Sequence, residues 1–260
     1  MTDALGDRMK SFYENRYRIY LTRRMPVIIR IDGNAFHTFT RGLDKPFDAH
    51  FMKMMQQTCL DLCKNIQGCV GGYVQSDEIS LLLIDYQTIK SDAWFDYNLQ
   101  KITSLAAARA TMTFNSLVNQ LILDARNDVK VFGEMCEYDI VEEKYALIYK
   151  WCDKQGRAMF DARAFNIPKE EVCNYFIWRQ KDATRNSIQA AGQAHFSHKE
   201  LDCKSQSDIQ EMLFQKGINW NDYTTPEKRG TFITRWCIDD NMPILTENRN
   251  YIDDLVFVGE

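Results

Sequence analysis

VGGYVQSDEISLLLID, residues 70–85, contains two strand-like runs, 70–75 and 78–85, joined tightly around Ser76 and Asp77. Both runs are rich in residues that favour strands, and the short connection predicts a β-hairpin. This hairpin is the centre around which the rest of the chain can be organised.

The segment before the hairpin predicts a strand followed by a helix. PVIIRID, residues 26–32, is a β-branched run closed by a Gly-Asn turn. From Asp48, a suitable N-cap, to about Ile66, apolar residues recur at helical spacing. An amphipathic helix is also predicted within residues 3–20.

After the hairpin, helical spacing predicts a second helix from about residue 99 to 124, and strand-like VKVF follows at 129–132. The order βαββαβ predicts an α+β fold built on the ferredoxin-like unit, which is the core of polymerase and cyclase palms and of many binding domains. We expect a polymerase-type palm with appended helices and strands. We expect residues 1–140 to form the palm catalytic core with an N-terminal helix. Residues 141–260 would form a C-terminal extension packed on the palm within the same single domain.

The C-terminal extension shows alternating strand and helix signals. They predict a strand at 158–167, a helix opened by Pro168 and ending near 194, a short helix at 206–216, a strand at 230–239 and an irregular tail.

Composition narrows the class of protein. With 260 residues and 45% hydrophobic residues, the chain can bury a core. It shows no signal peptide and no run of about 18 uncharged apolar residues, so we expect a cytoplasmic protein without membrane contact. Eight cysteines at irregular positions, with no CxxC pair, predict reduced thiols.

Charge gives a mixed indication for nucleic acid. A net charge of -4 argues weakly against RNA binding, because phosphate contacts need Lys and Arg. Acidic and basic residues nevertheless gather in separate stretches, which allows a basic face on an acidic protein. On helical spacing, one such face can combine Arg179, Asp182, Arg185 and Asn186, and it fits either a tRNA surface or a salt-bridged solvated face.

Carboxylates should meet where strands of the palm end. The first and third strands of a βαββαβ sheet are antiparallel neighbours, so Asp32 at the end of the first lies near Asp77 and Glu78 at the start of the third. Oxygen ligands of this kind suit Mg2+, and two such ions support nucleotidyl transfer. The alternative is that both segments are ordinary turns.

The loop GNAFHTFTRGLDKPFD, residues 33–48, connects the first strand to the following helix. Its turn can direct backbone N–H groups at a triphosphate, and Lys45 can add a positive charge. A single glycine is a weak indication of a phosphate loop, and His37 fits either a phosphate donor or a packed structural residue.

RIDGNAFHTFT, KPFD and YVQSDEIS resemble the signature segments of the tRNA-His guanylyltransferase family (Thg1) and its Thg1-like relatives. Further matches are Lys101 and Ser104, FDAR at 160–163, the segment 178–182 and KRG at 228–230. Together they span about residues 5 to 235.

The resemblance implies a role for most of these residues. Asp32 and Asp77, with the Gly33 backbone, would bind two Mg2+ ions, and Glu78 would belong to the same catalytic cluster. Nucleotide contacts would come from Gly33, Asn34, Ala35, Phe36, His37, Lys45, Asp48 and Ser76. Contacts with tRNA would come from Lys101, Arg179, Arg185 and Asn186.

The implied reaction adds templated nucleotides to the 5′ end of a truncated tRNA, in the 3′-to-5′ direction. ATP would activate a 5′-monophosphate, GTP or another nucleoside triphosphate would be added, and the enzyme would be a homotetramer. Eukaryotic members carry HINN where this chain has Thr184 to Ser187, so the resemblance is closer to the Thg1-like proteins.

Three other functions are compatible with parts of the sequence. A strict tRNA-His guanylyltransferase would share the whole site. A nucleotidyl cyclase would use the same metals and triphosphate without RNA, but Gly71 and Gly72 lie five residues before Asp77 instead of adjoining the acidic pair. A ferredoxin-like RNA-binding module would not need clustered carboxylates.

Overall fold

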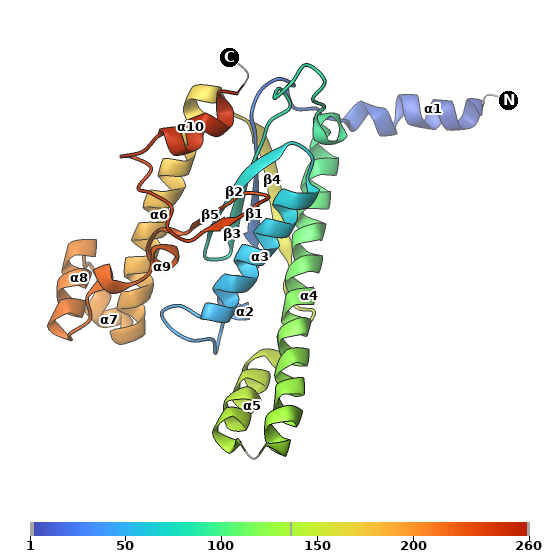
Figure 1. The fold of residues 1–260 in the computed structure, drawn as a ribbon. Helices are drawn as coiled ribbons and strands as arrows, with labels where there is room; N and C mark the ends of the chain where they lie inside the picture. Colours follow the sequence, from blue (N-terminus) through green and yellow to red (C-terminus); the bar gives the residue numbers. More distant parts are fainter. Residues whose placement is uncertain (1–2, 136, 259–260) are drawn as a thin grey trace.

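A six-stranded antiparallel sheet forms the centre of the computed structural model, which describes residues 3–135 and 137–258 (Figure 1). The strands lie in the order β4-β1-β3-β2-β5-β6. They are β1 Val27–Gly33, β2 Cys69–Gln75, β3 Glu78–Leu83, β4 Phe160–Asn166, β5 Thr231–Ile233 and β6 Ile238–Asp239. The order of the first four, 4-1-3-2, is that of a ferredoxin-like palm, and the predicted fold class is confirmed.

Helices cover both faces of this sheet (Figure 1). The α-helices of the described residues are α1 Ala4–Phe12, α2 Phe36–Phe39, α3 Ala49–Asn65, α4 Leu99–Glu134, α5 Tyr138–Cys152, α6 Lys169–His195, α7 His198–Leu201, α8 Gln206–Gln215, α9 Thr225–Arg229 and α10 Asn250–Val256. Short 3-10 turns are η1 Glu14–Tyr17, η2 Trp94–Tyr97 and η3 Trp220–Asp222. None of the helices in the described part of the chain is long and apolar enough to cross a bilayer.

Alternation along the strands creates two hydrophobic cores. In β1, Ile29 and Ile31 face the core beneath α3 and α4, whereas Ile28 faces the core beneath α6 and α10. Side chains of a strand point alternately to the two faces of a sheet, so residues two apart share a face. The same alternation places Arg30 and Asp32 on the α6 side.

The prediction of a strand at 129–132 is wrong, because these residues continue α4. Val118, Ile122 and Ala125 are buried at helical spacing, and α5 packs along the same end of the helix. Packing against α5 therefore outweighs the local strand preference of VKVF. The fourth strand of the palm is instead β4, at 160–166, so the sheet takes an edge strand from beyond residue 140.

Three other predictions differ from the structure at element ends. The N-terminal α-helix stops at Phe12, and α1 buries none of its residues and projects from the body (Figure 1). The strand predicted at 230–239 is divided into β5 and β6 by a turn in which Thr234 N donates to Cys237 O at 2.9 Å. The tail contains α10, which buries Ile252 and Val256.

A glycine joins α9 to β5 in a conformation that excludes a side chain. Gly230 has a φ of 80°, and a Cβ there would collide with the Val74 carbonyl oxygen and the Tyr73 ring. We expect Gly230→Ala to lower the free energy of unfolding, measured in urea, by clearly more than Gly217→Ala. Gly217 also has a positive φ, of 79°, but lies in open space, so it is the control without a collision. A side chain at positive φ costs about 1–2 kcal/mol. Equal losses would contradict the proposed collision.

Candidate active site

Three carboxylates meet at one edge of the sheet. In the β1–β3 register Asp32 lies opposite Glu78, and Gly33 N donates to the Asp77 carbonyl at 3.1 Å. The adjacency predicted from the strand order is therefore confirmed. The end of β1 and the tip of the β2–β3 hairpin bring together residues 45 positions apart in the chain.

Asp77 and Asp32 form an electrostatically unfavourable pair. Burial raises the pKa of Asp77, the negative charge of Asp32 raises it further, and a hydrogen bond from Ser76 opposes the shift. The Arg163 guanidinium lies 3.8 Å from the Asp32 carboxylate. The same guanidinium forms a closer ion pair with Asp161, at 3.2 Å. The edge can therefore accept positive charge from a ligand.

Glu78 lies beside this pair in a different environment. Its carboxylate, which is almost fully buried, forms ion pairs with Arg30 and with Arg179, the second at 2.7 Å. Arg179 also contacts Asp182 at 3.0 Å and stacks over the Trp178 ring at 4.4 Å. Burial raises the pKa of Glu78, and the two guanidinium groups oppose that shift. Glu78 therefore ties β3 to α6.

The donor set fits Mg2+ with few protein ligands. Within the described residues no cluster of three or more His, Cys, Asp or Glu side chains is arranged to hold a metal. Asp32 and Asp77 offer carboxylate oxygens, and Gly33, the next residue after Asp32, offers its backbone carbonyl. The Glu78 carboxylate is instead engaged in ion pairs with Arg30 and Arg179. Magnesium commonly binds one or two carboxylates together with water and substrate phosphates.

The loop after β1 contributes backbone groups more than side chains. Ala35 has a left-handed φ of 56° and begins the short helix α2. The first N–H groups of a helix have no partner within it, so those of Phe36 and His37 are oriented for an acceptor. The Phe36 side chain is buried among Phe39, Phe51, Phe114 and Phe160. Asn34 and His37 are exposed.

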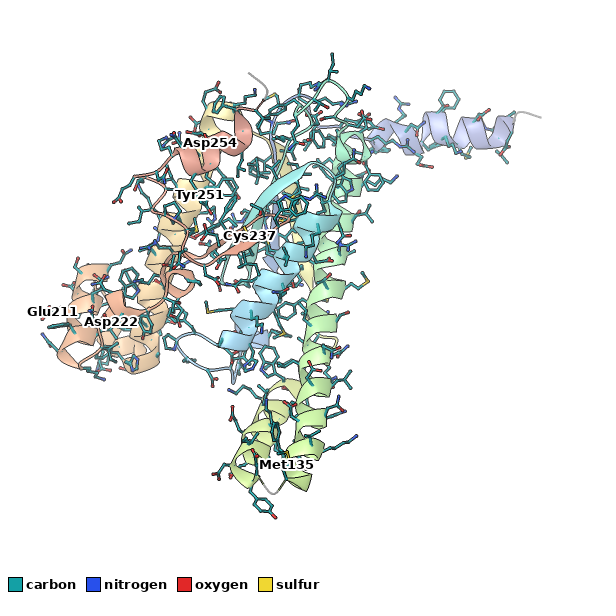
Figure 2. All side chains as sticks on the ribbon, viewed as in Figure 1. Met135, Glu211, Asp222, Cys237, Tyr251 and Asp254 are labelled. Atoms are coloured by element: carbon teal, nitrogen blue, oxygen red, sulfur yellow. The ribbon has the colours of Figure 1, made fainter. Side chains whose placement is uncertain are left out.

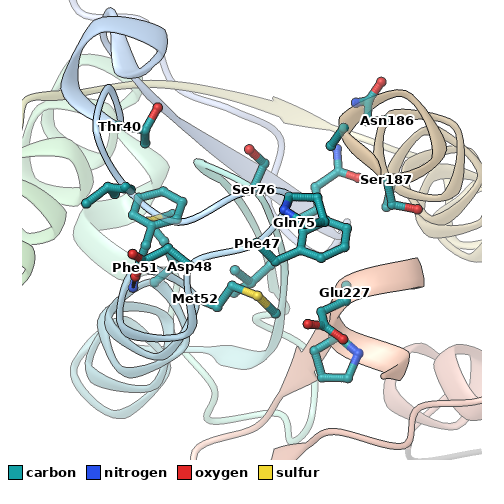
Figure 3. A pocket seen from close by; sticks show the side chains of 18 of the residues that line it. Thr40, Phe47, Asp48, Phe51, Met52, Gln75, Ser76, Asn186, Ser187 and Glu227 are labelled. Carbon is teal, nitrogen blue, oxygen red and sulfur yellow. Dashed lines mark hydrogen bonds between the residues drawn. The ribbon is translucent and has the colours of Figure 1, made fainter. Parts of the chain in front are cut away.

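A cavity of about 310 Å³ adjoins the hairpin tip, between the loop before α3, α6 and α9 (Figure 3). Lys45, Asp48, Ser76 and Asn186 line it together, although they come from three separate parts of the sequence. Its size falls at the lower end of that of small-molecule sites.

The cavity wall combines apolar surface with an unpaired polar group. Phe47 lies in the wall (Figure 3). The centre of its ring lies 5.3 Å from that of Tyr223, and the two rings are edge-on. The Gln75 side-chain oxygen is buried and has no hydrogen-bond partner among the described residues. Asp48 caps α3 by accepting from Phe51 N at 2.9 Å, so its carboxylate also shapes the loop.

The structure separates the predicted tRNA contacts. Lys101 lines another hollow, with Arg18 and Tyr20, at the start of α4, and its amine lies 4.7 Å from the Phe95 ring centre. The Arg179 side chain is 4% exposed, so its guanidinium serves the Glu78 network instead of the surface. Arg185 and Asn186 are exposed on α6.

Sequence reasoning assigned no role to Arg30, Asp161 or Arg163. Arg30 lies two residues before Asp32 in β1 and therefore on the same face of the sheet. Asp161 lies opposite Asp32 in β4. The FDAR segment, residues 160–163, matches a family motif. Because the fourth strand of the palm is predicted at 129–132 and not at 160–166, the sequence does not indicate that FDAR lies beside the carboxylates.

Comparison with known proteins identifies the group to which this fold and edge belong. The sequence model of Thg1, described as tRNAHis guanylyltransferase, matches residues 6–168. The chain belongs to the Thg1 family. Members of this family are nucleotidyltransferases that process tRNA, and this chain is therefore a nucleotidyltransferase.

Solved Thg1-like structures resemble the chain over nearly its whole length. A bacterial tRNA(His) guanylyltransferase (Thg1)-like protein in complex with ATP is 41% identical, with a TM-score of 0.83 over 98% of this chain and 100% of that one. One in complex with GTP is 38% identical, with a TM-score of 0.77 and the same coverage of both chains. A probable tRNA(His) guanylyltransferase of Dictyostelium discoideum is 25% identical over 82% of this chain and 76% of its own.

Proposed function

We propose that this chain adds templated nucleotides to the 5′ end of truncated tRNA, in the 3′-to-5′ direction. The observation that carries this proposal is the cavity of about 310 Å³ beside the Asp32–Asp77 edge. A nucleotide held there by its base would direct its phosphates past Ser76 towards the carboxylates.

The cavity residues suit a nucleoside triphosphate. Phe47 offers an apolar ring to a base, and the unpaired Gln75 oxygen could accept a hydrogen bond from an exocyclic amine. Lys45 would neutralise phosphate charge, and Ser76 could donate its hydroxyl proton to a phosphate oxygen. The ATP and GTP complexes of the two bacterial Thg1-like proteins support ATP for 5′ activation and GTP or another triphosphate for addition.

Asp32, Asp77 and the Gly33 carbonyl would hold two Mg2+ ions, which would neutralise phosphate charge and lower the barrier to transfer. The N–H groups of Phe36 and His37, which have no partner within α2, would orient the triphosphate beside them. Arg163, which pairs with Asp161 at 3.2 Å, would supply a cation to the phosphate oxygens at the same edge.

The substrate is proposed to be truncated tRNA because Thr184 replaces the histidine of the eukaryotic HINN segment. Lys101, Arg185 and Asn186 remain the proposed tRNA contacts. We also propose a homotetramer, as the family resemblance implies.

The experiment is incubation of purified protein with Mg2+, ATP, GTP and a 5′-truncated tRNA, with products resolved at single-nucleotide resolution. Extension that stops when the acceptor stem is complete supports templated repair. Addition of one guanosine to full-length tRNA-His alone would indicate the strict guanylyltransferase. A cyclic nucleotide formed without RNA would overturn the proposal.

Filling the cavity should weaken nucleotide use without unfolding the protein. Ala190 lines the cavity, whereas Ala194, one helical turn further along α6, does not. We expect Ala190→Leu to raise the KM for the nucleoside triphosphate roughly tenfold, the effect of about 1.4 kcal/mol, and Ala194→Leu to leave it unchanged. Equal KM values for the two variants would place the nucleotide elsewhere.

A further inference from the structure

The nucleotide cavity lies at one end of the row of residues that forms the catalytic edge. Asp161 of β4, Asp32 of β1, Glu78 of β3 and Gln75 of β2 lie side by side in the strand registers. The cavity includes Gln75 and continues to Thr231 of β5, so it occupies the β2 side of the carboxylates. An RNA end that shares these carboxylates with a nucleotide in the cavity can therefore reach them from the β4 side.

A half-exposed tryptophan lies on that β4 side. Trp178 of α6 is 49% exposed, and the Arg30 guanidinium of β1 lies 6.0 Å from its ring centre. The Tyr175 ring, 5.7 Å from that of Trp178 between centres, meets the Phe165 ring of β4 edge-on at 5.9 Å. This face of α6 therefore lies over β1 and β4, whereas Ala183, further along the helix, lines the cavity.

Contacts within the chain hold Trp178 in place. The Arg179 guanidinium lies 4.4 Å from its ring centre and is itself fixed by the Glu78 carboxylate at 2.7 Å. The hydroxyl of the neighbouring Tyr175 shares a hydrogen bond of 2.8 Å with that of Ser80 in β3. A rigid aromatic side chain loses little conformational entropy when a flat group stacks on it. Trp178 is therefore suited to hold a nucleobase against its exposed surface.

Positive charge lies beside this tryptophan. Arg163 lies opposite Arg30 in the β1–β4 register, so both side chains point to the α6 face of the sheet. The Arg163 side chain is 56% exposed. The ion-pair network next to Trp178 contains three guanidinium groups and two carboxylates, so it carries one net positive charge. Its members are Arg30, Glu78, Arg179, Asp182 and Arg185. Guanidinium groups bind phosphate strongly through charge-assisted hydrogen bonds.

We propose that Trp178 stacks on the 5′-terminal base of the RNA substrate and that Arg163 and Arg30 bind its 5′ phosphate. This phosphate would then lie beside Asp32, at the same carboxylates as the nucleotide. Stacking and guanidinium–phosphate contacts select no particular base, which suits an RNA whose end sequence changes as it is extended. The inference rests on the proposed function, because it names where the RNA of that reaction lies.

The test is the dissociation constant of a 5′-truncated tRNA that carries a 5′ monophosphate, measured by filter binding with Mg2+ and without nucleoside triphosphate. Trp178→Ala should raise this constant roughly tenfold, the effect of losing one stack between a base and an aromatic side chain. Trp178→Phe should restore most of the affinity, because phenylalanine keeps an aromatic face. The dissociation constant of ATP should stay unchanged in both variants, because the cavity is intact.

Trp236→Ala is the matched control. Trp236 is 83% exposed and also lies beside an arginine, with the Arg235 guanidinium 5.0 Å from its ring centre. It precedes Cys237 in the turn between β5 and β6, at the opposite edge of the sheet from β4 (Figure 2). This variant should bind the tRNA as the wild type does. A wild type that does not bind the tRNA, an unchanged constant in Trp178→Ala, an equal loss in Trp236→Ala, or no recovery in Trp178→Phe would overturn the proposal.

The 5′ phosphate gives a second measurement. The wild type should bind tRNA with a 5′ phosphate more tightly than the same tRNA with a 5′ hydroxyl, and Arg163→Gln should reduce this preference. Arg126→Gln removes an exposed positive charge from α4, on the other face of the sheet, and should keep the preference. An unchanged preference in Arg163→Gln would contradict the phosphate contact.

These binding measurements need no nucleotide addition, so the two proposals can fail separately. A chain that binds the tRNA end through Trp178 but adds no nucleotide would contradict only the proposed function. A chain that adds nucleotides, and in which Trp178→Ala binds tRNA normally, would contradict only this inference.

Discussion

Asp77→Asn is expected to abolish nucleotide addition while preserving the fold. Asparagine keeps the size of the side chain but removes the charge that would hold Mg2+ beside Asp32. We expect the rate of addition to fall by roughly 10³-fold or more, which corresponds to about 4 kcal/mol of lost transition-state stabilisation. The assay is single-turnover addition to 5′-truncated tRNA.

The same substitution should not destabilise the protein. Burial and the charge of Asp32 both raise the pKa of Asp77, so the ionised form is held there at a cost. The free energy of unfolding of Asp77→Asn, measured in urea without Mg2+, should equal or exceed that of the wild type. Asp153→Asn, an exposed carboxylate near α5, is the control with full activity. A large loss of stability together with activity would make Asp77 a structural residue.

The Asp32–Asp77 pair could be predicted from the sequence because an acidic residue at this turn is unfavourable for the fold by itself. A turn residue that repels its neighbour has no local structural reason to be acidic, and the strand order alone places Asp32 beside Asp77. The cavity was less predictable, because Lys45, Ser76 and Asn186 meet only after α6 packs on the sheet.

Predictions from the sequence were wrong where contacts between distant parts of the chain decide the structure. VKVF has the local character of a strand, yet α5 covers the end of α4 and makes the whole segment helical. Arg179 has the spacing of an exposed basic face, but its partner Glu78 lies 101 residues earlier in the chain. Neither partner can be identified from the composition of the segment itself.

Glu78→Leu is expected to destabilise the fold more than any surface charge substitution. It would leave the Arg179 guanidinium, which is 4% exposed, and that of Arg30 without their shared carboxylate. Removing one partner of a buried ion pair typically costs about 3–5 kcal/mol when the remaining charge is left uncompensated. Because Asp182 still contacts Arg179 at 3.0 Å, we expect a loss at the lower end of that range. The measurement is the free energy of unfolding in urea.

Glu14→Leu is the matched control, because Glu14 pairs with Arg18 at 2.8 Å on the surface, where both side chains are at least 40% exposed. Its loss should stay below about 1 kcal/mol. Equal losses for the two variants would mean that Glu78 does not connect β3 to α6.

A second variant separates this role from metal binding: Arg179→Met removes one cation and should also lower stability, although it leaves the carboxylate in place. If Glu78 served chiefly as a metal ligand, Arg179→Met would instead free it to bind, and Mg2+ would raise the stability of that variant more than that of the wild type.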